Sequence, residues 1–203
     1  MTTRIKYFYD VLCPSSWQNL LRLQELPSTS FSIDYQPVVN KRMKLLNLQR
    51  EAGKRFVPIN PEQFFAELYC KDAPTISAEH WQVHEQLLEE LNQTPHMFLQ
   101  AVKLYFSDRY VDAIDHLNRR IWEQRLPVSR GYHLFQTATA MGFEFRQSDF
   151  LVTQLCHHVV NEALGKGIVD AIEHGAVRAP FFVLSNGNGT EKRCSEKLDE
   201  LIQ

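Results

Sequence analysis

Hydrophobic and polar positions near the start of the chain predict two β-strands joined by a helix. Residues 4–12 (RIKYFYDVL) are rich in aromatic and β-branched types and alternate weakly, which is typical of a mostly buried strand. Trp17, Leu20 and Leu21 then fall on one face at helical spacing. Residues 31–39 (FSIDYQPVV) alternate apolar with smaller or polar side chains, which predicts a second strand. A helix that crosses between two strands favours their parallel pairing.

The middle of the chain is predicted to be helical. Residues 41–174 show almost no strand signal and several marks of helix starts. Asn60 and Thr94 each precede a proline, which is typical of an N-cap followed by proline in the first turn, and Ser148 indicates a further cap. Amphipathic runs such as HWQVHEQLLEEL at residues 80–91 lie between these caps. We therefore expect a block of several helices.

After this block the strand pattern returns. Residues 179–194 (APFFVLSNGNGTEKRC) consist of an apolar run, a turn rich in Asn and Gly, and a polar run, which is typical of a β-hairpin. Residues 195–203 are predicted to form a short helix capped by Ser195. The order βαβ, helices, ββα indicates an α/β, thioredoxin-like domain with a large all-helical insertion. The expected parts are residues 1–50 and 175–203 for the thioredoxin-like region and 51–174 for the insertion, within a single unit spanning 1–203.

Composition and charge exclude several functional classes. The 203 residues carry 22 Lys and Arg against 24 Asp and Glu, and the basic residues are scattered, which argues against nucleic acid or a membrane as the main partner. No apolar stretch approaches the roughly 20 residues of a membrane span. Charges occupy the first ten residues, where a signal peptide would be apolar. We expect an intracellular protein, and the sequence does not distinguish a mitochondrial, peroxisomal or cytoplasmic location.

Any cysteine chemistry is expected to come from a single thiol. The four cysteines are far apart and form no CxxC pair, which excludes a disulfide framework and a zinc ribbon, and we expect no metal site. Cys13 lies where the first strand gives way to the first helix, and the partial positive charge of a helix start favours a thiolate, with a pKa of roughly 3.5 to 7.5. Ser16 stands where a dithiol enzyme has its second cysteine, so an external thiol such as glutathione would have to resolve a mixed disulfide at Cys13. The alternative is that Cys13 is a small buried apolar residue.

Two further motifs add to the interpretation of Cys13 as a functional residue. Pro180 directly precedes a predicted strand, where a cis X–Pro bond is accessible, and in thioredoxin-like folds such a loop faces the start of the first helix. The backbone of the residue before that proline, here Ala179, pairs with the peptide of a thiol substrate in those folds. Ser195 and Glu196 at a helix start offer a hydroxyl, free N–H groups and a negative charge, which suit the γ-glutamyl end of glutathione. The alternatives are an ordinary trans proline and a plain helix cap.

Four segments, in order along the chain, resemble the kappa-class glutathione transferases, a DsbA-like thioredoxin-fold family related to the 2-hydroxychromene-2-carboxylate isomerases. YFYDVLCPSSW is similar to the family's FYDVLSPYSW, and FLQAVKLYFSDRYVDAIDHLNRRIW to its FL.AV.L segment and following helix. AIEHGAVRAPFFV is similar to the cis-proline loop YGAFGLP, and CSEKLDEL to GSDR..LL. The resemblance therefore spans the whole chain.

The resemblance implies site residues and also shows where this chain differs. The family's catalytic serine aligns with Cys13 and its following tyrosine with Ser15, whereas Ser16 matches. The implied catalytic residues are Cys13 and Ser16. The implied glutathione-binding residues are Ser15, Lys54, Ala179, Pro180, Ser195 and Glu196, with Lys54 standing for a basic residue of the lid.

Three functions are open at this point. The leading hypothesis is a glutathione transferase that binds glutathione next to Cys13 and conjugates it to small hydrophobic electrophiles, with glutathione as co-substrate, no other cofactor, and a homodimeric assembly as the family implies. A thiol is a weaker hydrogen-bond donor than a hydroxyl, and a Cys13 thiolate would repel that of glutathione, so the replacement of serine weakens this mechanism. The alternative is a glutathione-dependent monothiol disulfide oxidoreductase acting through Cys13. The further alternative is a non-catalytic thioredoxin-fold binding module.

Overall fold

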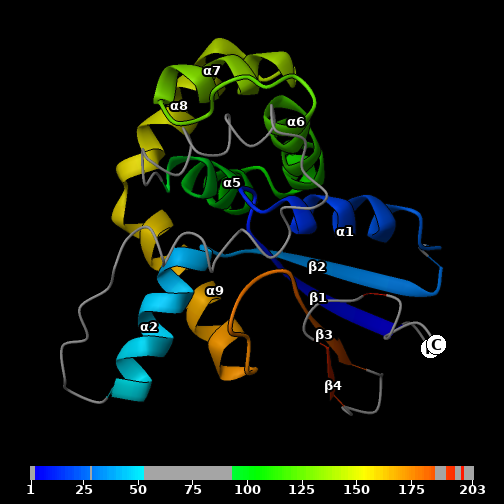
Figure 1. Cartoon of the computed structure of the whole chain (residues 1–203). Helices are drawn as coiled ribbons and strands as arrows, with labels where there is room; N and C mark the ends of the chain where they lie inside the picture. The colour runs from blue at the N-terminus through cyan, green and yellow to red at the C-terminus, as the bar shows by residue number, and fades with distance from the viewer. Residues whose placement is uncertain (1–2, 28, 53–92, 186–190, 195–197, 199–203) are drawn as a thin grey trace. The chain divides into compact units, whose positions relative to one another are not determined.

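The computed structural model describes residues 3–27, 29–52, 93–185, 191–194 and 198 (Figure 1). The chain divides into two compact units, residues 1–71 with 167–203 and residues 72–166. The predicted cap at Asn60, the run at 80–91 and the predicted helix at 195–203 lie outside the described residues, apart from Leu198.

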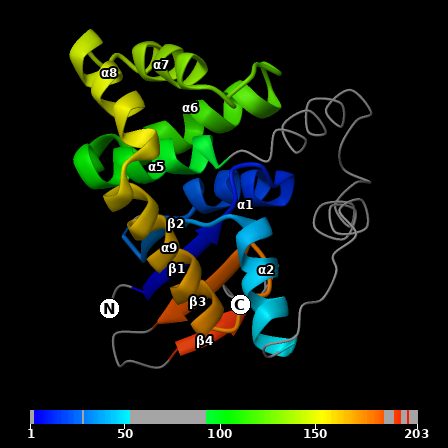
Figure 2. The ribbon, with the colours of Figure 1, turned by 90° about the vertical axis from the view of Figure 1, so that its left-hand side faces the viewer.

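The first unit is built on a four-stranded mixed sheet with the order β2-β1-β3-β4 (Figure 2). Strands β1 (Thr3–Tyr9) and β2 (Phe31–Pro37) are parallel, with Tyr7 opposite Tyr35. Strand β3 (Phe181–Ser185) runs antiparallel to both β1 and β4 (Glu191–Cys194). The predicted parallel pair and the predicted hairpin are both confirmed.

Alternation along β1 assigns the covering helices to the two faces of the sheet. Tyr7 is fully buried, and its hydroxyl donates a hydrogen bond of 2.6 Å to the Ser16 carbonyl in helix α1 (Pro14–Gln24). Lys6 and Phe8 face the other way, toward the end of helix α9 (His158–Glu173), where Lys6 pairs with Asp170. Helix α2 (Asn40–Ala52) is linked to the loop after α9 by Asn47, whose amide donates to the Ala176 carbonyl at 3.4 Å.

The buried face of helix α1 includes Leu20, as predicted, but not Leu21. The buried helical positions include Ser16, Asn19, Leu20 and Leu23, whereas Leu21 is 38% exposed. Two polar residues can lie on this face because each has a backbone partner: Ser16 Oγ accepts the Asp10 N–H, and Asn19 donates to the Ser15 carbonyl.

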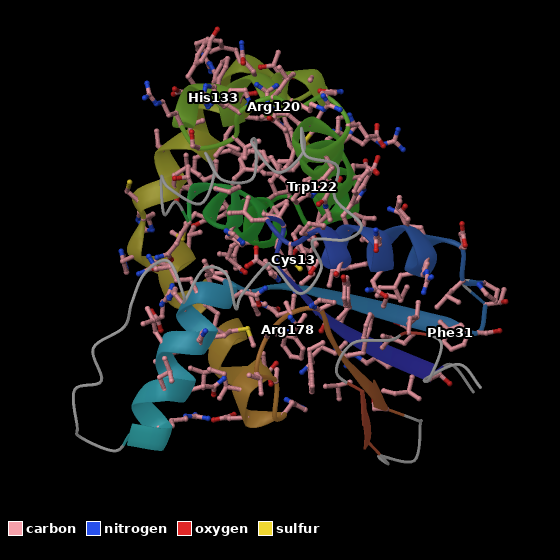
Figure 3. The ribbon with its side chains drawn as sticks, in the orientation of Figure 1. Cys13, Phe31, Arg120, Trp122, His133 and Arg178 are labelled. Carbon is pink, nitrogen blue, oxygen red and sulfur yellow. The ribbon has the colours of Figure 1, made fainter. Side chains whose placement is uncertain are left out.

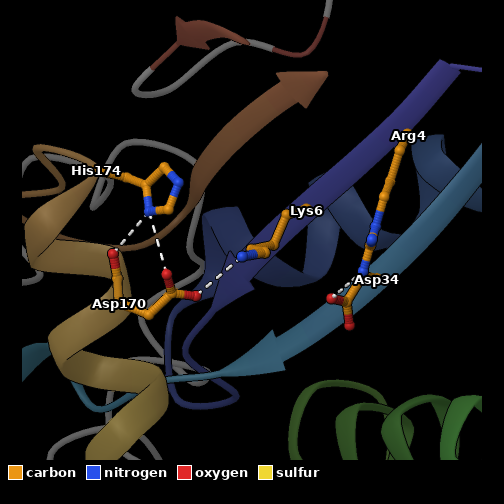
Figure 4. Close-up of polar contacts among 5 residues, drawn as sticks. All are labelled: Arg4, Lys6, Asp34, Asp170 and His174. Atoms are coloured by element: carbon orange, nitrogen blue, oxygen red, sulfur yellow. Dashed lines mark hydrogen bonds and ion pairs between the residues drawn. The ribbon is translucent and has the colours of Figure 1, made fainter. Parts of the chain in front are cut away.

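Two ion-pair groups lie on the α9 face of β1 and β2 (Figure 4). Asp170 bridges two partners, with 3.1 Å from one oxygen to Lys6 Nζ and 3.2 Å from the other to His174 Nδ1. Arg4 pairs with Asp34 across the two parallel strands at 3.2 Å. The Arg4 side chain is 61% exposed, so solvent screening leaves that pair little energetic weight.

A glycine returns the chain from α9 toward β3. Gly175 has a φ of 88°, its N–H bonds to the Ile172 carbonyl, and the N–H of Ala176 bonds to the Ala171 carbonyl. These are the bonds of a Schellman helix end, which requires a left-handed residue. Gly175 therefore directs the chain into the loop that precedes β3.

The second unit is helical in its described part, as predicted. Its elements are α5 (Thr94–Tyr105), η2 (Ser107–Arg109), α6 (Tyr110–Trp122), α7 (Gly131–Ala140), α8 (Phe145–Thr153), η3 (Gln154–Cys156) and the first part of α9. Helix α5 begins at Thr94, one position earlier than an N-cap at that residue would give, and its N-cap is Gln93. The predicted cap at Ser148 is wrong, because α8 begins three residues earlier with a capping box formed by Glu144 and Gln147.

Candidate functional site

Cys13 is the N-cap of helix α1, as its position between strand and helix predicted (Figure 3). Its backbone is extended (φ −103°, ψ 118°), and its carbonyl accepts the N–H groups of Ser16 and Trp17 at 3.0 and 3.2 Å. Pro14 occupies the first turn, where its missing N–H leaves no bond unmade. The helix therefore starts directly at Cys13.

The loop before β3 lies against Cys13. The peptide bond between Ala179 and Pro180 is cis, as predicted, and the following residue, Phe181, pairs with Phe8 of β1. Cys13 Sγ donates a weak hydrogen bond of 3.8 Å to the Ala179 carbonyl. The structure thus brings together the thiol and the residue before the cis-proline, which are 166 positions apart in the sequence.

Asn40, the first residue of α2, holds the same loop from another side. Its amide nitrogen donates to the Ala179 carbonyl at 3.2 Å, and its amide oxygen accepts the Ala179 N–H at 2.6 Å. Asn40 is fully buried, and Ala179 is 1% exposed. Both backbone groups of Ala179 are therefore bound by one side chain.

Asp10 connects the cysteine turn to Asn40. Its carboxylate is fully buried and accepts the N–H of Leu12 at 2.9 Å on one oxygen and the N–H of Asn40 at 2.8 Å on the other. The Asp10 carbonyl also accepts the N–H of Cys13 at 2.9 Å. One residue thereby fixes the backbone at Leu12 and Cys13 and the start of α2.

Asp10 and Asn40 were not predicted as site residues. A signal was present, because each is a polar residue placed just after the apolar end of one of two parallel strands, and such ends meet at one edge of a sheet. Their mutual contact spans 30 positions of the chain, and that of Asn40 with Ala179 spans 139. Local pattern carries no information about which residues meet over such distances.

Tyr7 lies beneath the site as a neutral hydrogen-bond donor. Burial raises the pKa of Tyr7 well above its usual value of 10, and the nearby Cys13 raises this pKa further. The phenol therefore keeps its proton at neutral pH and holds the Ser16 carbonyl in the first turn of α1.

Of the remaining predicted site residues, the structure describes Ser15 and Ser16 but not Lys54, Ser195 and Glu196. Ser16 is 2% exposed, and its hydroxyl accepts the Asp10 N–H at 3.2 Å, so it stabilises the connection from β1 to α1, and a catalytic role for it stays a prediction. Ser15 is half-buried beside it. Lys54, Ser195 and Glu196 lie outside the described residues, and their roles in binding glutathione stay predictions.

Positive charges flank the contact between Asn40 and Ala179 along the chain. Lys41 and Arg42 follow Asn40, and Arg178 precedes Ala179. Partial burial lowers the pKa of Lys41 and that of Arg42, because burial disfavours the charged form of each side chain. These cations belong to the two segments that meet at the site.

The second unit contains the other described free cysteine. Cys156 is exposed and borders an open hollow of about 540 Å³ that is also lined by Met97, Leu155 and His158. Across the described ranges, no cluster of three or more His, Cys, Asp or Glu side chains is arranged to hold a metal ion. In the same part of the chain, no helix has both the length and the apolar character needed to span a membrane.

Comparison with known proteins identifies the fold. No protein-family model matches the chain, and no curated protein matches its sequence. Solved structures do match over nearly the whole chain. A putative protein disulfide isomerase from Nitrosomonas europaea has a TM-score of 0.61 at 12% identity, covering 97% of this chain and 90% of its own. A 2-hydroxychromene-2-carboxylate isomerase has a TM-score of 0.62 at 12% identity, covering 95% and 88%.

A third similar structure is the cytosolic disulfide reductase DsbM from Pseudomonas aeruginosa, with a TM-score of 0.56 at 12% identity, covering 95% of this chain and 89% of its own. Identities this low establish similarity of fold and leave activity open. The predicted α/β architecture with its helical insertion is confirmed: the chain has a DsbA-like thioredoxin fold.

Proposed function

We propose that the chain catalyses glutathione-dependent thiol–disulfide exchange through Cys13. The observation that carries this proposal is the position of Cys13 Sγ, at the start of α1 and 3.8 Å from the carbonyl of the residue before cis-Pro180. A cysteine at a helix start beside a backbone edge is suited to attack a disulfide whose peptide is held there. The names of two of the similar structures, a disulfide isomerase and a disulfide reductase, support the same chemistry.

The reaction follows from the single thiol. After loss of its proton to solvent, the Cys13 thiolate attacks one sulfur of a substrate disulfide, forms a mixed disulfide and releases the other half as a thiolate. Glutathione thiolate then attacks the substrate sulfur of the mixed disulfide and regenerates Cys13. A second glutathione attacks the resulting substrate–glutathione disulfide, so two glutathione molecules reduce one disulfide and leave as glutathione disulfide. Ser16 at the third position after Cys13 cannot close a disulfide, which is why the external thiol is required.

Glutathione fits the charges near the site. It is a peptide thiol with two carboxylates and one ammonium. Three cations are close in sequence to Asn40 and Ala179, which meet beside Cys13: Lys41, Arg42 and Arg178. The predicted contacts of Lys54, Ser195 and Glu196 would add a cation, a hydroxyl and a carboxylate that match the same ligand.

The test uses a Cys156→Ser background, which removes the thiol that is exposed in the described part of the chain. Peptide mapping distinguishes Cys13 from Cys70 and Cys194, which remain. After incubation with glutathione disulfide, peptide mapping by mass spectrometry should locate one glutathione on Cys13. Reduction of hydroxyethyl disulfide by glutathione should proceed in this background and stop in Cys13→Ser/Cys156→Ser. Absence of the adduct, or full turnover without Cys13, would refute the proposal.

A second candidate is the kappa-type glutathione transferase, which one feature of the site favours. Cys13 is 2% exposed and its sulfur lies against a carbonyl oxygen, an arrangement that suits a neutral S–H donor. In this role the S–H group would donate to the glutathione thiolate while that thiolate attacks a small hydrophobic electrophile.

The variant Cys13→Ser separates the two candidates. A hydroxyl is the stronger donor, so conjugation of glutathione to a chlorinated nitroaromatic acceptor should be kept or increased in Cys13→Ser if the residue acts as a donor. Exchange through a mixed disulfide should be abolished by the same change. Conjugation in neither protein would exclude the transferase.

A further inference from the structure

Asn40 holds Ala179 as a peptide backbone would. A carboxamide offers an N–H donor and a carbonyl acceptor side by side, the same kind of pair that a peptide unit presents. Asn40 uses both on a single residue, with 2.6 Å to the Ala179 N–H and 3.2 Å to the Ala179 carbonyl. Two such bonds to the N–H and C=O of one residue are what an added antiparallel strand makes.

The site described above is closed. Cys13 is 2% exposed, Ala179 1% and Asn40 0%. A thiol that must meet a disulfide cannot react in this arrangement, so an opening step has to precede chemistry. The backbone of Asn40 is fixed by Asp10 at 2.8 Å independently of its side chain. The carboxamide can therefore rotate away from Ala179 while the bond that anchors the start of α2 is kept.

We propose that Asn40 is an internal occupant of the peptide-docking edge at Ala179, and that a peptide thiol reaches Cys13 by displacing its carboxamide. This inference rests on the function proposed above and adds a determinant of substrate choice. A substrate with a peptide backbone replaces both hydrogen bonds when it docks. A disulfide without a backbone leaves Ala179 unpaired once Asn40 moves, and unpaired buried groups are costly. The edge at Ala179 thereby favours peptide disulfides over other disulfides, and Asn40 controls access to that edge.

The alternative role is that Asn40 stabilises the loop before β3 in the conformation that binds substrate. Removing the carboxamide then weakens peptide docking, whereas removing an occupant strengthens it. The sign of the effect on peptide substrates therefore separates the two roles.

The experiment compares the rate of mixed-disulfide formation at Cys13 with two probes, glutathione disulfide and hydroxyethyl disulfide, in the Cys156→Ser background. The variants are Asn40→Ala and Asn40→Ser, the second keeping a side chain that caps a helix start but is too short for two bonds. The matched control is Asn47→Ala, because Asn47 lies on the same helix and bonds the loop carbonyl of Ala176 instead. Circular dichroism checks that each variant is folded.

The rate of mixed-disulfide formation with glutathione disulfide should rise about tenfold when the carboxamide is removed, as expected for the loss of two competing hydrogen bonds, and should stay unchanged in Asn47→Ala. The rate with hydroxyethyl disulfide should rise by a similar factor, because both probes need the carboxamide displaced. A glutathione disulfide rate that stays constant or falls in both Asn40 variants overturns the inference, and a fall assigns Asn40 a bracing role.

A separate outcome tests the proposed function. If Cys13 reacts with neither probe in any protein, the exchange function fails, and the inference is then judged by calorimetric titration with S-methylglutathione. Tighter binding to Asn40→Ala than to the parent supports an occupied docking edge. Equal, weaker or absent binding overturns it.

Discussion

Replacing Asp10 with asparagine should destabilise the first unit far more than an equivalent change at an exposed carboxylate. The Asp10 side chain is fully buried and accepts two backbone N–H groups at 2.9 and 2.8 Å, one oxygen for each. Asparagine keeps one acceptor and turns an amide N–H toward the second backbone donor. The loss of one charge-assisted bond, with a buried donor left unpaired, corresponds to about 2 to 3 kcal/mol.

The control is Asp34→Asn, which breaks the exposed pair with Arg4 at 3.2 Å and should cost less than about 1 kcal/mol. Both free energies of unfolding are to be measured by urea denaturation with far-UV circular dichroism, and the denaturant slope should stay unchanged. If Asp10→Asn is no more destabilising than Asp34→Asn, Asp10 does not hold the cysteine turn to α2 in the way described here.

Three further changes test other features of the first unit. Burial raises the pKa of Tyr7 well above its usual value and that of Tyr35 to about 12, so their contribution to stability is complete below about pH 10 and lost as pH rises further. Tyr7→Phe should therefore reduce the fall in unfolding free energy above about pH 10, measured by urea titrations at several pH values, and an unchanged slope would contradict this. Gly175→Ala should cost about 1 to 2 kcal/mol in thermal unfolding, because alanine strains at a φ of 88°, and no loss would exclude that strain. A double-mutant cycle of Lys6→Met and Asp170→Asn should give a coupling of about 0.5 to 1 kcal/mol, and zero coupling would leave their 3.1 Å contact without energetic weight.

The sequence predicts those parts of the fold that depend on residues close together in the chain. The cysteine at the helix start follows from a strand pattern, a proline in the first turn and helical spacing after it. The hairpin follows from an Asn- and Gly-rich turn between two runs of strand character. The parallel pair follows from the helix that joins two strands. These features depend on periodicity and turn chemistry, which act over a few residues.

The sequence does not predict those parts of the fold and the site that depend on contacts between distant residues. Leu21 was expected on the buried face, but the face that is buried includes Ser16 and Asn19, whose side chains bond to the Asp10 N–H and the Ser15 carbonyl. The contact of Asn40 with Ala179 joins segments 139 positions apart. Burial of a polar residue becomes favourable once its partner is known, and the sequence does not give the partner.

The separation of the two halves of the site in the chain has a consequence for protein synthesis. Cys13 and Asn40 leave the ribosome long before Ala179, which follows Cys13 by 166 positions. At ordinary elongation rates this interval lasts roughly ten to thirty seconds. During that time the nascent polypeptide has a thiol but no cis-proline loop beside it, so an alkylating reagent should modify Cys13 faster on a ribosome stalled before β3 than in the finished protein.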